Sequence, residues 1–465
     1  MINLLDKALS IDTLIFIFTT LIFIILINKK KVNFYSKLAI CLLFLAFNSS
    51  YNIMVKRVHD FNIQIPRNFI WNFDVISSFS LFDLIFILLM ILGIPSILKV
   101  IQDDFLVRIT FIRDISIIII GTISYVLFEG YWLDGGKNYI LTIKGLVYFC
   151  GALFLTIKYL NFEFSLKDYL LPISLILFNG LFSLQFFPTQ EIWVRYGQRI
   201  KILDQEDAYT ISLFIITLLI IYVSFSNIKN NKKIYYTTIF FLIAFFLQNA
   251  LSIYKTNFVY YVYVLMIIPF LGITKRQFIK WYSLLTIIMI ITILGAGIVI
   301  NISTSQSIMT RSSQIEDYFS YINSQFPGAH LIGSGIGTPY YSVSETNDLG
   351  EVKIIDKENS MNSNYKFTFQ IPILFIYKYS GILGIILFLL FWIIILLKMF
   401  KEFKVVKNSN MSDFSKSEYY SIAIYLTFFS ILWGSVMLGG TTPFFIFLGF
   451  IIGRLYYLRK KLITP

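Results

Sequence analysis

The chain has 465 residues, of which 57% are hydrophobic and 14% charged, whereas soluble domains carry about 25% charged residues. Lysine and arginine outnumber aspartate and glutamate by 39 to 26. This composition excludes an ordinary soluble protein, and long apolar runs along the whole chain predict a polytopic membrane protein.

Apolar runs separated by charged residues predict about 13 transmembrane helices. In chain order they lie at about 12–28, 35–54, 73–98, 114–130, 138–157, 168–187, 210–227, 234–254, 257–273, 281–300, 369–397, 419–437 and 443–458. Helices are expected because backbone groups in lipid must find their hydrogen bonds within the chain. The predicted fold is an all-α polytopic membrane protein.

Two large extracytoplasmic loops divide this series of helices. Residues 1–300 are predicted to hold the first ten spans, including an outer loop at 188–209. Residues 301–368 form the larger outer loop, and residues 369–465 hold the C-terminal spans. Connections of this length are usually functional or disordered.

The distribution of charge predicts the orientation of the chain. Loops assigned to the cytoplasm contain 24 of the 39 lysines and arginines, as cytoplasmic loops of membrane proteins usually do. The basic excess therefore reflects topology, and nucleic-acid binding is not predicted because the basic residues are spread singly over short loops. The C-terminus is expected in the cytoplasm, and the first apolar run, which ends at Lys29, is expected to be a retained anchor.

The run at 369–397 is too long for one untilted helix and contains Pro372 and Gly381. It predicts a short interfacial or re-entrant segment up to Ser380, followed by a true span from Ile382.

Several classes of protein lack support in the sequence. Cys41 and Cys150 lie in apolar runs, and no cysteine–histidine spacing suits a metal, so neither a metal nor a cofactor is predicted. There is no phosphate-binding P-loop, and the run from Gly333 to Thr338 does not match the dinucleotide fingerprint. The spans lack repeated acidic residues, which argues against a proton-coupled pump, and Lys144 is expected to extend to the membrane interface.

Cations on the predicted outer side are the first candidates for a binding site. They are Arg195, Arg199, Lys201 and Arg311. A guanidinium group pairs bidentately with phosphate oxygens, so the arginines suit a diphosphate at the membrane surface. The alternative is that they pair with nearby acidic residues of the same loops.

A glycine-rich stretch in the larger loop holds the remaining candidates. Gly333, Gly335 and Gly337 allow the backbone to approach a ligand closely, although a plain loop with turns has the same composition. His330 is a candidate general base because imidazole titrates near neutral pH, and an incidental loop histidine is the alternative. The environment of Lys378 stays open.

The order of these features carries a resemblance. Arg311 opens the loop, the run Gly333-Ser-Gly-Ile-Gly337 follows, then Asn362-Ser-Asn-Tyr365, and a span contains Tyr379-Ser-Gly-Ile-Leu-Gly384. This order, over about residues 305–395, resembles the O-antigen polymerase and ligase superfamily, the Wzy-type enzymes. An aromatic residue that the family shows after the arginine is replaced by Ile315 here.

The resemblance implies a C-type glycosyltransferase-like fold in a bacterial inner (plasma) membrane. The implied reaction transfers a glycan chain from undecaprenyl diphosphate onto a new lipid-linked repeat unit at the outer face of that membrane. The implied partners are an undecaprenyl-diphosphate-linked oligosaccharide, membrane lipid and a chain-length regulator. A donor that is already activated needs no metal if arginines stabilise the departing charge.

The resemblance also gives roles to residues. Arg311, helped by Arg195, Arg199 and Lys201, holds the diphosphate. The acceptor proton is taken by His330, Glu316 or Asp317. The set of substrate-binding residues is completed by Gly333, Gly335, Gly337, Tyr365 and Lys378. Sugar rings are expected to stack on tyrosines of the loop, such as Tyr318, Tyr321, Tyr340 and Tyr341.

Two alternatives remain beside a polymerase. An O-antigen ligase shares the fold and donor but uses another acceptor. A lipid-linked oligosaccharide flippase or transporter is expected to place charged residues within its spans, whereas the charge here is expected in loops.

Overall fold

The computed structural model describes about three fifths of the chain. The described residues are 11–49, 74–76, 79–128, 136–185, 206–225, 312–341, 365–366, 369, 372–432 and 442–463, with single positions between 236 and 267. Helices dominate this part, in agreement with the all-α class.

The helices are α2 (Ile11–Asn28), α3 (Phe34–Ser49), α4 (Leu81–Asp103), α5 (Phe105–Leu127), α7 (Lys137–Tyr159), α8 (Leu166–Gln185), α10 (Glu206–Phe225), α14 (Ala329–Ile332), α15 (Pro372–Asn408), α16 (Asp413–Leu432) and α17 (Thr442–Ile463). A further helix covers residues 312–323. The short strands β1 (Asp74–Ile76) and β2 (Phe79–Ser80) pair antiparallel, as do β3 (Tyr340–Tyr341) and β4 (Tyr365–Lys366).

Three described helices are long and apolar enough to cross a membrane by length and composition. They cover Leu81–Asp103, Thr142–Tyr159 and Ile373–Asn408. The predicted runs at 234–254, 257–273 and 281–300 and the predicted outer loop at 188–209 lie wholly or largely outside the described residues. The structure thus supports a helical membrane protein without establishing thirteen spans.

Several helix bounds differ from the predicted runs. α5 begins at Phe105 and α16 at Asp413, about two turns before the predicted starts at 114 and 419. The helices continue through charged residues because these side chains find partners inside the bundle, as described below.

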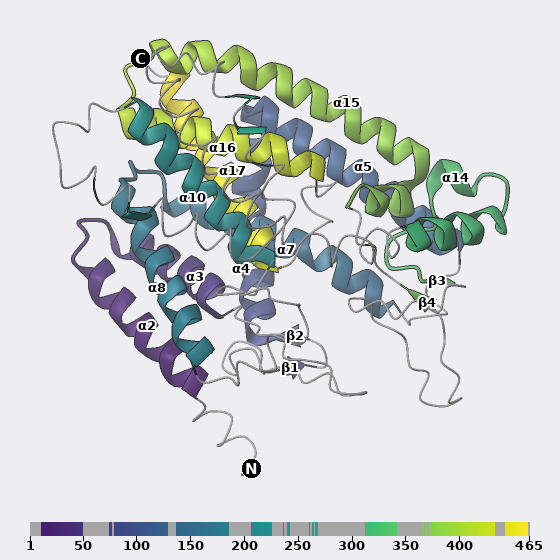
Figure 1. Cartoon of the computed structure of the whole chain (residues 1–465), viewed down its shortest axis with the longest axis horizontal. Coiled ribbons are helices and arrows are strands. Elements are labelled where there is room, and N and C mark those ends of the chain that lie inside the picture. Colours follow the sequence, from purple (N-terminus) through teal and green to yellow (C-terminus); the bar gives the residue numbers. More distant parts are fainter. Residues whose placement is uncertain are drawn as a thin grey trace, which may run out of the picture.

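The core lies where α7 packs between α4 and α17. Figure 1 shows these helices at the centre of the molecule, with α15 and α5 along the upper edge and α2 and α8 side by side at the left. Gly449 and Gly453, four residues apart on α17, face α7 closely: a Cβ at Gly453 would lie 2.7 Å from Thr156 Cβ. Such small residues let helices approach closely in membranes.

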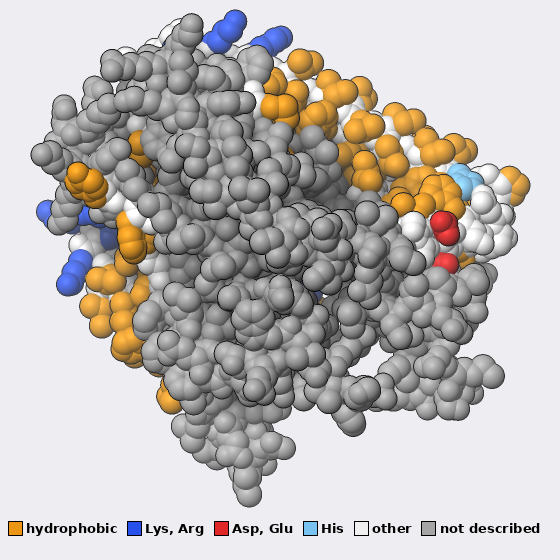
Figure 2. Space-filling view, viewed as in Figure 1, with side chains coloured by type: hydrophobic (Ala, Val, Ile, Leu, Met, Phe, Trp, Pro, Cys, Tyr) orange, Lys and Arg blue, Asp and Glu red, His pale blue; other side chains and the backbone are white. Residues whose placement is uncertain are grey.

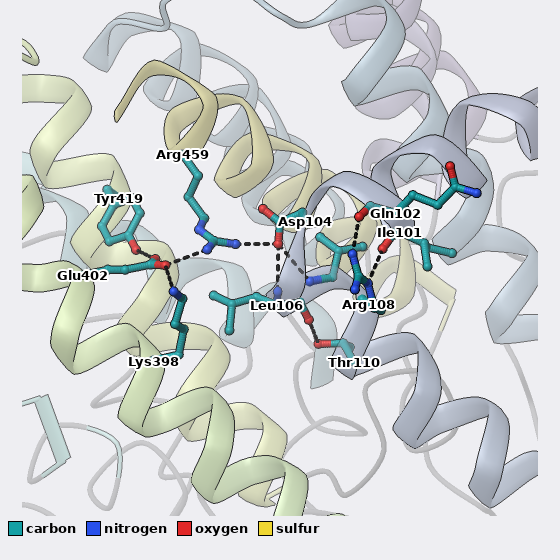
Figure 3. Close-up of polar contacts among 11 residues, drawn as sticks. Ile101, Gln102, Asp104, Leu106, Arg108, Thr110, Lys398, Glu402, Tyr419 and Arg459 are labelled. Atoms are coloured by element: carbon teal, nitrogen blue, oxygen red, sulfur yellow. Dashed lines mark hydrogen bonds and ion pairs between the residues drawn. The ribbon is translucent and has the colours of Figure 1, made fainter. Parts of the chain in front are cut away.

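One end of the bundle carries a network of ion pairs, which we call the polar end. Arg459 of α17 contacts Asp104 and Glu402, the latter at 2.6 Å. Tyr419 of α16 donates to Glu402 at 2.5 Å, and Asp104 caps α5 by accepting from Leu106 N at 2.9 Å. Figure 3 shows these side chains pointing toward one another from α15, α16, α17 and the junction of α4 and α5.

Other helix connections meet at the same end. Lys30, after α2, pairs with Asp168 of α8 at 2.5 Å, and Lys461 near the end of α17 pairs with Glu163 between α7 and α8. The end of α2, the connection from α7 to α8 and the end of α17 therefore lie together at the polar end. On the face shown in Figure 2, lysine and arginine side chains lie at the upper and left margins, and the histidine and acidic side chains lie at the opposite tip.

Candidate functional site

The opposite end of the bundle carries residues 312–341, and α15 is broken there. Gly381 has φ 60° and ψ −155°, which is not helical. The predicted break between Ser380 and Ile382 is confirmed. A side chain at Gly381 would collide with the backbone of Leu331 and of Gly333, and its Cβ would lie 2.5 Å from Gly333 N. Glycine is therefore needed both for the positive φ and for the space.

The glycine-rich stretch caps this break. A broken helix leaves carbonyl groups without their usual partners, and Ser334 N and Gly335 N both donate to Lys378 O, at 2.8 and 3.0 Å. Ile336 N donates to Gly121 O of α5 at 3.1 Å. The stretch therefore joins α5 to α15.

The glycines make their close approaches to the protein itself. A Cβ at Gly333 (φ 71°) would lie 2.6 Å from Tyr377 O, and one at Gly335 (φ 96°) would lie 2.6 Å from Tyr125 Cα. Gly337 also has a positive φ, of 75°. The sequence suggested that these glycines let the backbone approach a ligand. At Gly333 and Gly335, the close approach is instead to the backbone of α15 and α5.

His330 lies on α14 and is half-buried. Its Nδ1 lies 2.5 Å from the hydroxyl of Tyr377, and its Nε2 lies 2.6 Å from Oδ1 of Asn323. If Asn323 Oδ1 accepts from Nε2–H, the Nδ1 lone pair accepts from Tyr377. Asn323 is exposed, so Nε2 is the ring nitrogen closer to solvent. Nε2 can take a proton in the other tautomer, in which Nδ1–H donates to the Tyr377 hydroxyl.

The ring of Phe319 packs against the rings of His330 and Tyr377. Its centroid lies 6.1 Å from that of His330 and 5.4 Å from that of Tyr377, both nearly parallel. Glu316, one of the two carboxylates predicted as alternative bases, is exposed on the same helix, and Asp317 is buried to 6% exposure.

The predicted sugar-stacking role is wrong for two tyrosines. Tyr318 and Tyr340 are fully buried and pack edge to face at 5.4 Å, with Phe369 completing the cluster. Burial raises the pKa of the Tyr318 hydroxyl, which stays protonated and lies 3.3 Å from Ser334 Oγ. These rings stabilise the loop and present no face to a glycan, and Tyr321 is partly buried beside them.

Other predicted residues take different places. Lys378 is fully buried, with Nζ 5.6 Å from the centroid of the Tyr379 ring, and its carbonyl is the group that the glycine stretch uses. Tyr365 pairs with Tyr341 across β3 and β4, and the side chains of both lie outside the described part. Arg195, Arg199, Lys201 and Arg311 lie outside the described residues altogether.

Sequence reasoning missed buried charges within helices. Lys144 was expected to extend to the membrane interface, but its Nζ pairs at 2.5 Å with the buried carboxylate of Asp83. Asp83 also accepts a hydrogen bond from Tyr148 and caps the start of α4. Arg454 and Glu418 are both fully buried and paired at 2.7 Å. The helices therefore hold several buried acidic residues, contrary to the expectation that the spans lack repeated ones. Asp83 lies inside the predicted run at 73–98, and Glu418 lies directly before the predicted run at 419–437.

A second buried pair is incompletely satisfied. Arg113 Nε contacts Asp114 Oδ1 at 2.9 Å, and both side chains are fully buried. Within the described part of the chain, both terminal nitrogens of Arg113 and Oδ2 of Asp114 have no hydrogen-bond partner. Arg113 lines a cavity of about 30 Å³ between α5, α15, α16 and α17, which is large enough for water.

Comparison with known proteins found no matching family model, no similar curated protein and no similar solved structure.

Proposed function

We propose that this chain is a metal-independent glycosyltransferase of polymerase type in a bacterial plasma membrane. It transfers a glycan from undecaprenyl diphosphate onto a lipid-linked repeat unit. The observation that supports this most is the packing of residues 312–341 onto α5 and the break in α15. Residues 312–341 begin directly after Arg311 in the chain and include His330, Glu316 and Asp317.

The charge distribution supports the proposed orientation. The polar end gathers helix connections rich in lysine and arginine, such as the one at Lys29–Lys31, and such connections usually face the cytoplasm. The C-terminus then lies in the cytoplasm and the segment with His330 lies outside, where a polymerase of this type works.

The proposed step is a displacement at the anomeric carbon of the donor. The acceptor hydroxyl oxygen forms the new glycosidic bond, the bond from that carbon to the diphosphate oxygen breaks, and the hydroxyl proton passes to His330 or to one of the two carboxylates. The diphosphate leaves with both electrons of its bond. Arg311, with Arg195, Arg199 and Lys201, stabilises that charge and so replaces a metal.

The buried charges are an argument for the alternative function, a flippase, because intramembrane ionisable residues often mark transport pathways. Arg454, however, donates to both oxygens of Glu418 and to the carbonyls of Leu160 and Phe162. All of these contacts lie within the protein, so the pair serves to hold α7, α16 and α17 together. The polymerase therefore remains the better proposal.

Deletion of the gene in its host, followed by analysis of surface glycan and lipid-linked intermediates, tests the proposal. A polymerase predicts surface glycan of a single repeat unit. Full-length polymer accumulating on the lipid carrier would identify a ligase, and single units trapped on the cytoplasmic side would identify a flippase. Complementation with Arg311→Ala is expected to fail while Lys401→Ala, an exposed cation of α15 near the polar end, restores long chains.

A further inference from the structure

Exposed aromatic and aliphatic side chains gather around His330. Phe319, Phe326 and Leu331 are 37%, 41% and 51% exposed. They belong to a segment that the sequence assigns to a polar outer loop, where clustered large apolar side chains usually mark a binding surface.

This apolar group continues the exposed surface of two long helices. The ring of Phe326 packs at a tilt against that of Phe128, with the centroids 5.2 Å apart, and Phe128 directly follows the exposed Val126 and Leu127 of α5. Leu331 lies against Gly381, which directly precedes the exposed Ile382 of α15. Figure 2 shows hydrophobic side chains along α15 up to the histidine at the tip.

The length of α15 gives the depth of this surface in a membrane. From Gly381 to Glu402 the helix rises about 32 Å, at about 1.5 Å per residue. The hydrocarbon layer of a bilayer is about 30 Å thick. With Glu402 and Arg459 at one boundary of this layer, Gly381 and its neighbour Leu331 lie at the other boundary.

We propose that residues 319–331 are a membrane-interface anchor that binds the outer leaflet. Phe319, Phe326 and Leu331 insert among the lipid headgroups and the first acyl carbons, while Ser324 and Gln325, also exposed, face water. Amphipathic segments of this kind bind through their buried apolar area. Resting on the proposed function, the anchor has a consequence for catalysis: it keeps His330 at the height of the diphosphate of a lipid-linked donor.

Spin labels on the full chain in phosphatidylcholine–phosphatidylglycerol vesicles test the anchor. The natural thiols are removed by Cys41→Ser and Cys150→Ala, and nitroxides are attached at Leu331→Cys or Phe326→Cys. Ser324→Cys, from the polar side of the same segment, is the matched control, and Ile386→Cys of α15 is the reference for lipid exposure. Collisions with oxygen, which concentrates in lipid, are compared with collisions with a water-soluble nickel chelate.

The anchor predicts that labels at 331 and 326 favour oxygen, as the label at 386 does, and that the label at 324 favours the nickel chelate. Equal preference for the chelate at 324, 326 and 331 would overturn the anchor. So would labels at 326 and 331 that neither reagent reaches, because a protein surface would then cover them. These readings do not involve glycan transfer, so the anchor and the polymerase proposal fail independently.

Discussion

Replacing Arg454 with leucine removes the guanidinium that joins three helices at the polar end. The change leaves Glu418 buried with no cation and leaves the carbonyls of Leu160 and Phe162, bound at 2.7 and 2.8 Å, without that donor. Breaking a buried pair by removing one partner costs about 3–5 kcal/mol. We expect Arg454→Leu to lose about that much free energy of unfolding.

The assay is equilibrium unfolding of the purified protein in mixed detergent micelles. The natural comparison is the pair Arg113–Asp114, which is equally buried but leaves three polar atoms without partners among the described residues. Replacing both of its members by leucine is expected to leave stability unchanged or raise it by about 1–4 kcal/mol. Two results would contradict this expectation. One is that Arg454→Leu loses less than about 1 kcal/mol of free energy of unfolding, and the other is that the double variant loses more than Arg454→Leu does.

Three further predictions concern the end that carries His330. Gly335→Ala places a Cβ 2.6 Å from Tyr125 Cα at a φ of 96°. The resulting strain of about 1–3 kcal/mol should give faster amide hydrogen exchange in residues 329–341, and exchange at the wild-type rate would contradict the packing of this stretch on α5. Tyr377→Phe removes the hydroxyl 2.5 Å from His330 Nδ1 and should shift the pH dependence of glycan transfer, whereas an unchanged profile would remove His330 from proton transfer. Asp83→Asn weakens the contact with Lys144 and should destabilise the start of α4 and α7 in a thermal melt, while Lys99→Gln, exposed in the other half of α4, should not.

The break in α15 was predictable from the sequence because its signals are local. Ser380 and Gly381 interrupt an apolar run that is too long for one span, and glycine is the residue that accepts a positive φ. What occupies the space beside the break was not predictable. The bonds from Ser334 and Gly335 to Lys378 O join residues more than forty positions apart, and no periodicity in the sequence reports such a contact.

The helix starts were misplaced for a related reason. Charged residues such as Arg113, Asp114 and Glu418 were taken as the ends of apolar runs, yet they lie inside helices because each finds a partner of opposite charge. Likewise, a loop rich in tyrosine suggested sugar stacking, but Tyr318 and Tyr340 are buried in an aromatic cluster. Local composition cannot distinguish a ring that binds a ligand from one that packs within the loop.

The most direct test of the proposed polymerase activity is glycan transfer by the purified chain in vesicles. The substrate is the undecaprenyl-diphosphate oligosaccharide extracted from a host that lacks this gene, supplied without nucleotide, nucleotide sugar or divalent metal. A polymerase of this kind is expected to give a ladder of lipid-linked products that differ by whole repeat units, and Arg311→Ala is expected to give none. Absence of products longer than one repeat unit with the wild-type chain, or an equal ladder with Arg311→Ala, would contradict this expectation.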